Sequence, residues 1–170
     1  MDNRSGPTPN KREISPRTFE LDGLEMHPIQ CNNEDDFRGH ADIHPQRQRQ
    51  SVVKFCNQVR WGYKPFTRDD DIKQNHLRGI RRRYTDGAGV NHDFRIIWEG
   101  GCRTTAHEQS PYRPLPGDSG PNCYQIMKWN FRNCTNGGVG GSTKLGCLVY
   151  TYNGGLGGRR FSNEALWRSK

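Results

Sequence analysis

Six cysteines, each standing alone along the chain, constrain the fold more than any other feature of this sequence. They are Cys31, Cys56, Cys102, Cys123, Cys134 and Cys147. Even the nearest two are 11 positions apart, whereas zinc and redox sites need close pairs such as C-x2-C. An even set of widely spaced cysteines instead predicts three disulfides and a protein secreted into an oxidising, extracellular compartment.

The composition explains why such bridges would be needed. The chain has 170 residues, of which 31% are hydrophobic and 20 are glycine, so the core of its single domain is expected to be thin. One bridge that closes a loop of tens of residues contributes roughly 2–4 kcal/mol. That is a large part of the net stability of a domain, and we therefore expect the fold to depend on the bridges.

Segments at both ends differ in composition from this domain, which we place at residues 19–153. Residues 1–18 contain three prolines and few apolar residues, a pattern that predicts a disordered leader or the remnant of a pro-segment. The dibasic pair Lys11 and Arg12 is a candidate processing site within it, although an ordinary basic tail explains the pair equally well. Residues 154–170 form a glycine-rich, basic tail.

The charge of the chain indicates the chemistry of its partners. The net charge is +8 and the isoelectric point is about 9.4, which favours an anionic cell wall, membrane surface, nucleic acid or acidic protein. Solubility alone is the alternative explanation. No apolar run reaches the roughly 18 residues that a membrane span requires, so we expect no transmembrane segment.

Periodic apolar positions predict two helices and at least two strands. Residues 45–60 place apolar side chains on one helical face after Pro45 at the first position. A second helix is expected over 121–135, with Asp118 or Ser119 as its N-cap and Gly137 just beyond its end. Alternation predicts strands over 92–98 and 145–152, and the first of them is expected to be the second strand of a hairpin from Leu77 to Trp98.

The second helix restricts how the cysteines can pair. Cys123 and Cys134 would lie roughly 16 Å apart along its axis at 1.5 Å per residue, and a disulfide tolerates Cα separations of only about 4.4–6.8 Å. They are therefore expected to bond to other elements. Cys56 is the natural partner from the first helix, and Cys147 could reach Cys102, but the other pairings stay open. The expected fold is α+β, with two helices packed on a mainly antiparallel β-sheet or small β-barrel.

Two short motifs resemble catalytic sites but lack essential parts. Ser119 in a Gly-Asp-Ser-Gly-Pro run and His107 are similar to the nucleophile and histidine motifs of trypsin-like proteases, yet they lie 12 positions apart rather than on two barrels. His40 and His44 have the spacing of a metalloprotease motif, but Ala41 stands where its glutamate is required. We expect no catalytic residue, cofactor or metal.

Two surface sites are further candidates. Arg78, Arg81, Arg82 and Arg83 could form a basic binding patch beside Tyr84, or simply solvate an edge strand. The second site consists of four aromatic residues that could stack on a glycan, namely Trp61, Tyr63, Trp98 and Tyr112. A secreted ribonuclease with His92 and Arg95 is a weaker alternative, because alternation places these two side chains on opposite faces of one strand.

The spacing of the cysteines and of the glycine-rich loops resembles small cysteine-rich proteins secreted by filamentous fungi. The segments that carry this resemblance are Phe55-Cys56, Trp98 to Cys102, Asn122-Cys123, Asn133 to Gly138 and Gly146 to Tyr150. Some of these proteins are necrotrophic effectors with a removable pro-segment, and others are modules attached to chitinases. The resemblance implies a secreted effector or toxin that binds a host plant protein. We expect a monomer without nucleic acid as a partner, and a glycan-binding module is the alternative function.

Overall fold

The computed structural model describes residues 21–157 apart from Leu77 and Ser119. The predicted leader, including Lys11 and Arg12, lies outside the described residues, as does the part of the predicted tail beyond Gly157. The elements are β1 (Gln30–Cys31), η1 (Glu34–Phe37), α1 (Pro45–Gly62), β2 (Phe66–Thr67), η2 (Arg68–Asp70), β3 (Ile80–Thr85), β4 (Asn91–Trp98), β5 (Glu108–Gln109), α2 (Cys123–Arg132), β6 (Gly140–Leu145) and β7 (Leu148–Gly154).

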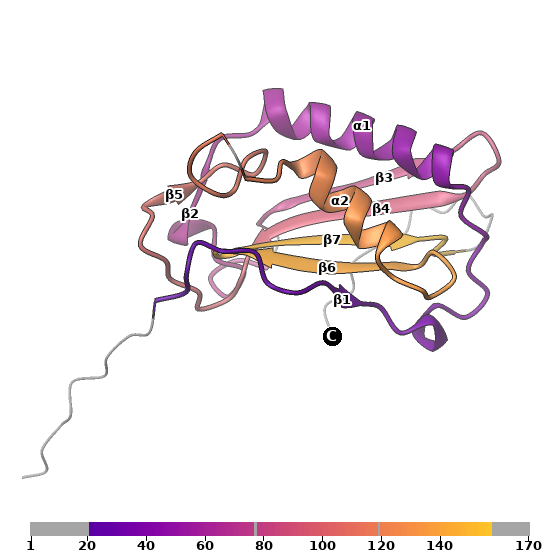
Figure 1. Cartoon of the computed structure of the whole chain (residues 1–170), viewed down its shortest axis with the longest axis horizontal. Helices are drawn as coiled ribbons and strands as arrows, with labels where there is room; N and C mark the ends of the chain where they lie inside the picture. Colours follow the sequence, from indigo (N-terminus) through magenta and orange to yellow (C-terminus); the bar gives the residue numbers. More distant parts are fainter. Residues whose placement is uncertain (1–20, 77, 119, 158–170) are drawn as a thin grey trace, which may run out of the picture.

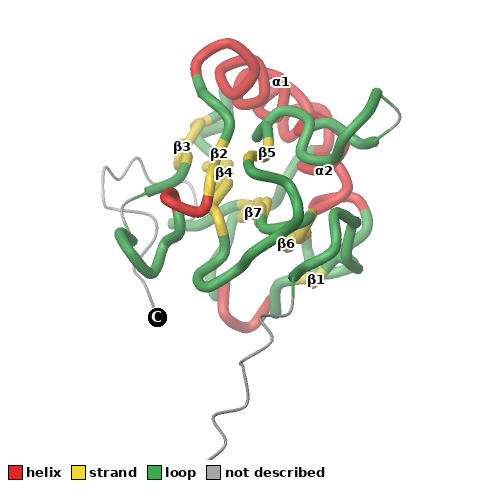
Figure 2. The backbone as a smooth tube through the Cα atoms, turned by 90° about the vertical axis from the view of Figure 1, so that its left-hand side faces the viewer, coloured by secondary structure: helices red, strands yellow, loops and turns green. Residues whose placement is uncertain are grey.

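Five strands form one antiparallel sheet in the order β1-β6-β7-β4-β3. Both helices lie on the same face of this sheet, α1 over β3 and β4, and α2 over β6 and β7 (Figure 1). Figure 2 looks onto the end of the molecule where β2 and β5 form a separate two-stranded sheet. The predicted α+β class is thus confirmed, and an open sheet replaces the barrel that the sequence left as an alternative.

The helix α1 follows the predicted pattern closely. His44 caps its first turn by accepting a hydrogen bond from the backbone N–H of Gln46, and Pro45 occupies the first helical position. The four apolar positions of the predicted face are buried, namely Val52, Phe55, Cys56 and Val59, so the helix presents one continuous face to the sheet. Phe55 stacks on Phe94 of β4 with ring centroids 4.9 Å apart, which joins the two layers at the centre of the core.

The helix α2 is shorter than the sequence predicted. It begins at Cys123 rather than at residue 121, because Asn122 and Gln125 form a capping box in which each side chain bonds the backbone N–H of the other. The expectation that Asp118 or Ser119 caps this helix is therefore wrong. The helix ends at Arg132, so Cys134 lies in the turn that follows, and Gly137 lies further along the same turn with a φ of +68°.

Three disulfides connect these layers, and they join Cys56 to Cys123, Cys102 to Cys147, and Cys31 to Cys134. The first links the two helices, the second links the start of β7 to the loop after β4, and the third links β1 to the turn after α2. Cys123 and Cys134 do not bond each other, as predicted, and α2 is held near both of its ends.

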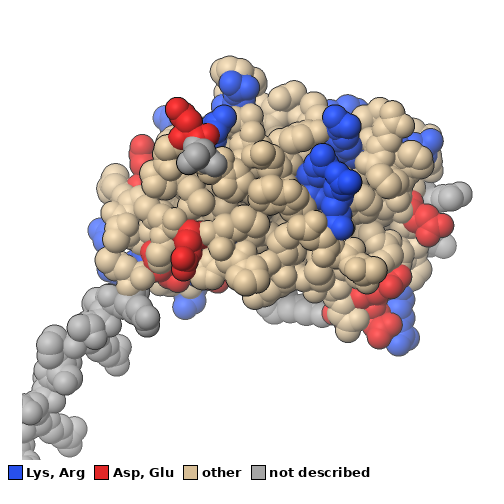
Figure 3. Space-filling model, viewed as in Figure 1, with Lys and Arg blue, Asp and Glu red and all other residues tan. Residues whose placement is uncertain are grey.

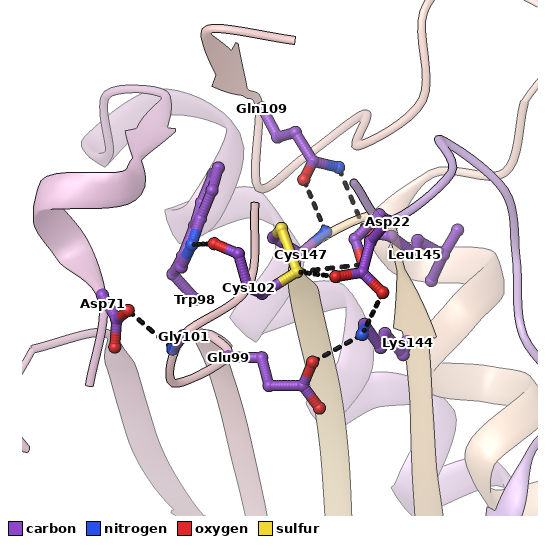
Figure 4. A network of polar contacts seen from close by, with 11 residues as sticks. Asp22, Asp71, Trp98, Glu99, Gly101, Cys102, Gln109, Lys144, Leu145 and Cys147 are labelled. Carbon is purple, nitrogen blue, oxygen red and sulfur yellow. Dashed lines mark hydrogen bonds and ion pairs between the residues drawn. A yellow bond between two sulfur atoms is a disulfide. The ribbon is translucent and has the colours of Figure 1, made fainter. Parts of the chain in front are cut away.

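A polar network fixes the end of the sheet at the bridge between Cys102 and Cys147 (Figure 4). The ammonium group of Lys144 contacts carboxylate oxygens of Asp22 and Glu99, at 3.1 and 2.5 Å. The buried amide of Gln109 accepts a hydrogen bond from the backbone N–H of Cys147 at 2.8 Å. These contacts attach the chain before β1 and the loop after β4 to the same end of the sheet.

The last strand continues past the predicted start of the tail. Gly154 is the final residue of β7, and Gly155 donates its backbone N–H to Asn91 at 2.8 Å and accepts one from Ala41 at 3.2 Å. The tail predicted from residue 154 therefore begins with two residues that belong to the folded domain. Neither helix in the described part of the chain is long and apolar enough to cross a membrane.

Candidate binding face

The charged side chains of the two helices, which form an outer layer, are all basic. The 18 residues of α1 and the 10 residues of α2 include no aspartate or glutamate. Their cationic side chains are Arg47, Arg49, Lys54, Arg60, Lys128 and Arg132. Figure 3 shows blue side chains gathered over this layer, with the acidic side chains toward the rim of the same view. We call this surface the cationic helix layer.

Few of these charges are neutralised within the described residues. Arg47 approaches Asp86 at 3.9 Å, and Arg49 donates from Nε to the hydroxyl of Tyr124 at 2.9 Å. Lys54, Arg60, Lys128 and Arg132 have no carboxylate partner in the described part of the chain. A protein surface whose charges all have one sign attracts an oppositely charged partner. The attraction extends over about one Debye length, roughly 8 Å at physiological salt.

Aromatic side chains and arginines meet where α1 ends. The Arg60 guanidinium lies 4.6 Å from the ring centroid of Trp61 and 5.1 Å from that of Tyr112. Arg82 lies 5.8 Å from the ring centroid of Tyr63 and donates to its hydroxyl. Trp61 keeps 77% of its surface exposed. We call these five residues the arginine–aromatic cluster. Tryptophan, tyrosine and arginine are the residue types that contribute most of the binding energy in many protein interfaces.

Three of the four aromatic residues that the sequence offered for glycan stacking contribute to this cluster. The prediction is wrong for Trp98, which is only 1% exposed and donates its indole N–H to the backbone oxygen of Cys102 at 3.0 Å. Its position in β4, in phase with Phe94, directs its side chain into the core.

The predicted basic patch is divided between two faces of the sheet. Arg82 points toward α1 and Tyr63, because alternate residues of β3 point to opposite faces. Arg83 points to the other face and donates to both carboxylate oxygens of the buried Asp93, at 2.8 and 3.0 Å. Arg81 shares that second face and donates to the backbone oxygens of the loop before β3. The four arginines therefore do not form one surface.

The fourth of these arginines, Arg78, lies before the strand. It is exposed and pairs with Asp70 at 3.1 Å, so part of its charge is compensated locally. The sequence also suggested that these arginines are mostly solvated on an edge strand. This alternative does not describe Arg81 and Arg83, because both are half-buried.

The histidine proposed for a ribonuclease lies inside the protein. His92 is fully buried and contacts Asp86 through Nε2 at 3.0 Å and the hydroxyl of Tyr152 through Nδ1 at 2.9 Å. Burial lowers the pKa of His92, although Asp86 opposes this shift. Burial opposes ionisation of Asp86 too, but hydrogen bonds from His92 and two backbone amides hold the pKa of that carboxyl below its usual value. This geometry fixes the turn between β3 and β4 and gives the ring no access to a substrate.

The remaining catalytic candidates do not form a catalytic site among the described residues. His40 contacts Glu34 at 3.0 Å, and His44 caps α1, so the two histidines do not converge. Ser119 lies outside the described residues, and His107 is exposed. Among the described residues, Asp22, Cys102 and Cys147 are the one group close enough together to ligate a metal ion, but both cysteines are consumed by a disulfide.

No protein-family model matches the chain, and neither the curated proteins nor the solved structures contain a match.

Proposed function

We propose that the protein is a secreted fungal effector or toxin that binds an acidic host plant protein and thereby promotes virulence or cell death. The observation that carries this proposal is the cationic helix layer, which has six basic and no acidic side chains in its helices. Fungal origin and a plant host come from the resemblance of the cysteine and glycine pattern. The three disulfides support an extracellular site of action.

The arginine–aromatic cluster supplies the contacts that charge alone does not. Long-range charge accelerates encounter with a partner and selects its sign, while affinity comes from a few well-packed residues. Trp61 projects from the end of the cationic helix layer, and Arg60 lies against its ring. A partner that buries Trp61 would also place its acidic side chains over the helices.

The structural positions of the candidate catalytic residues favour a binding function over catalysis. Two of the histidines lie in hydrogen-bonded structural positions, His92 in the core and His44 at a helix cap. In contrast, Arg60, Trp61 and Arg82 are exposed to solvent. A robust hydrolytic activity of the pure protein, lost on a single substitution, would contradict this proposal.

The proposal is tested by infiltrating the oxidised protein into leaves of a panel of plant genotypes, beside a reduced and alkylated sample. We expect genotype-dependent necrosis that disappears on reduction. The double variant Lys54→Glu/Arg60→Glu should lose it, because the charge of the helix layer is reversed at two exposed positions. The double variant Arg38→Glu/Arg68→Glu is a control, since it makes an equivalent change at two exposed residues outside the helix layer. Equal necrosis from all variants would contradict the role of the helix layer.

The exposed ring of Trp61 favours glycan binding as a second candidate function. A cleft beside this ring is lined by the side chains of Asn57, Gln58, Tyr63 and Arg82, so an aromatic face lies next to planar hydrogen-bonding groups. Sedimentation with insoluble chitin or glucan tests this alternative. Binding that is lost in Trp61→Ala would support it, whereas protein that stays in the supernatant would favour the effector function.

A further inference from the structure

A second concave site lies between the beginning of α1 and the end of α2. Its volume is about 640 Å³, within the range of small-molecule sites, roughly 300–1,000 Å³. Ile43, Pro45 and Phe131 give it apolar walls, and Arg49, Lys128 and Arg132 are its charged lining residues. We call this site the interhelical groove. No acidic side chain lines it.

Backbone without side chains forms part of the wall of the interhelical groove. Gly138 has a φ of +83°, and a Cβ at this position would lie 3.1 Å from Cβ of Ile43 and 3.1 Å from Cε2 of Phe131. A side chain there would crowd Ile43 and Phe131, two of the three apolar residues of the groove walls. The glycine turn after α2 therefore keeps the apolar part of the groove accessible.

The cations of the groove come from both helices. Arg49 of α1 is oriented by its hydrogen bond to Tyr124 of α2, so the guanidinium is held across the gap between the helices. Lys128 and Arg132 lie one helical turn apart on α2. None of the three has a carboxylate partner in the described residues, and this leaves a cationic edge next to an apolar surface.

We propose that the interhelical groove binds a small amphiphilic anion, namely a free carboxylate or sulfonate with an aliphatic or aromatic body. The apolar body lies against Ile43 and Phe131, and the anionic head lies between the cations of the two helices. Charge complementarity selects an anion, and the concave shape of the groove favours a small molecule over a flat membrane surface. The groove shares Arg49, Lys128 and Arg132 with the cationic helix layer, but Lys54, Arg60 and Trp61 do not line it, so separate variants test this site and the proposed function.

The test uses 1-anilinonaphthalene-8-sulfonate, a fluorescent aromatic sulfonate, with the oxidised full chain. We expect saturable fluorescence that decanoate displaces and that an uncharged dye such as Nile red does not reproduce. Lys128→Gln and Arg132→Gln should each raise the dissociation constant of the dye about fivefold, which is the effect of losing one partly exposed ion pair. Lys54→Gln, which removes an exposed cation of α1 outside the groove, should leave it unchanged.

Controls separate this site from other sources of dye binding. The near-UV circular dichroism and the thermal unfolding of each variant should match those of the unmodified protein. A match shows that a change in dye binding comes from the groove and not from a loosened core. Loss of binding in Trp61→Ala, with no effect of Lys128→Gln or Arg132→Gln, would overturn the proposal in favour of the arginine–aromatic cluster. Binding to phosphatidylserine vesicles without displacement by decanoate would overturn it in favour of a membrane surface.

Discussion

Replacing both cysteines of the bridge between the helices tests the energetic role of the disulfides. The bridge between Cys56 and Cys123 closes a sequence separation of 67 residues, for which the chain-entropy relation gives about 4.4 kcal/mol at 25 °C. The two other bridges already shorten the effective loop in the unfolded chain, which lowers this contribution to about 3 kcal/mol. Because both cysteines are almost fully buried, Cys56→Ala/Cys123→Ala also leaves a small cavity that costs about 1 kcal/mol more.

A second double variant separates these two contributions. Cys31→Ala/Cys134→Ala removes a bridge that spans 103 residues, but Cys31 is exposed. Of this pair only Cys134 is buried, so we expect a similar entropic loss, about 3 kcal/mol, with a smaller packing loss than for the pair between the helices.

Urea unfolding followed by circular dichroism and tryptophan fluorescence gives the free energy of unfolding for each variant. The m-value should rise in both variants, since an unfolded chain with fewer cross-links exposes more surface. A loss below about 1 kcal/mol for Cys31→Ala/Cys134→Ala, beside a loss of several kcal/mol for the buried pair, would refute the entropic reasoning and show that packing dominates.

Two further predictions concern buried polar groups. Since the pKa of His92 is lowered in the folded state, the unfolded chain binds more protons below the usual histidine pKa of about 6.5, and stability should fall as the pH decreases from there toward the folded pKa. Thermal unfolding across this pH range should show a shallower dependence in His92→Gln, and an identical dependence would contradict the assignment. Asn130 is buried and donates to the backbone oxygen of Tyr150 at 2.9 Å, so Asn130→Ala should cost about 2–3 kcal/mol in urea unfolding. The exposed Asn133→Ala is its matched control, and an equal loss in both variants would argue against a role for the buried amide.

Local patterns in the sequence predicted the elements that bury one regular face. The apolar positions of α1 and the alternation in β4 follow from helix and strand geometry alone. The exclusion of a bond between Cys123 and Cys134 was correct although only Cys123 lies in the helix, because the length of the ten-residue helix α2 still separates the two cysteines. The alternation in β4 also predicts that Trp98 is buried, since this residue lies in phase with Phe94. Its assignment to the surface was an error of interpretation, because the strand pattern already placed its ring in the core.

Features that depend on distant contacts could not be predicted in this way. The strand β1 has two residues and is defined by its pairing with β6, and no local periodicity indicates such a strand. The interhelical groove exists because the start of α1 lies beside the end of α2, and Ile43 and Phe131 are 88 positions apart in the sequence. The capping box of Asn122 was a local signal that could have been found, since asparagine followed three residues later by glutamine is typical of a helix start.

The order of the bridges along the chain also determines what a protease can release. The bridge between Cys56 and Cys123 is nested inside the one between Cys31 and Cys134, and the bridge between Cys102 and Cys147 overlaps both. Any single cut between Cys31 and Cys147 is therefore spanned by at least one disulfide. A nicked molecule keeps its mass until it is reduced, and its severed loop stays attached to an otherwise intact domain. Limited proteolysis within this span would therefore be visible only after the disulfides are reduced.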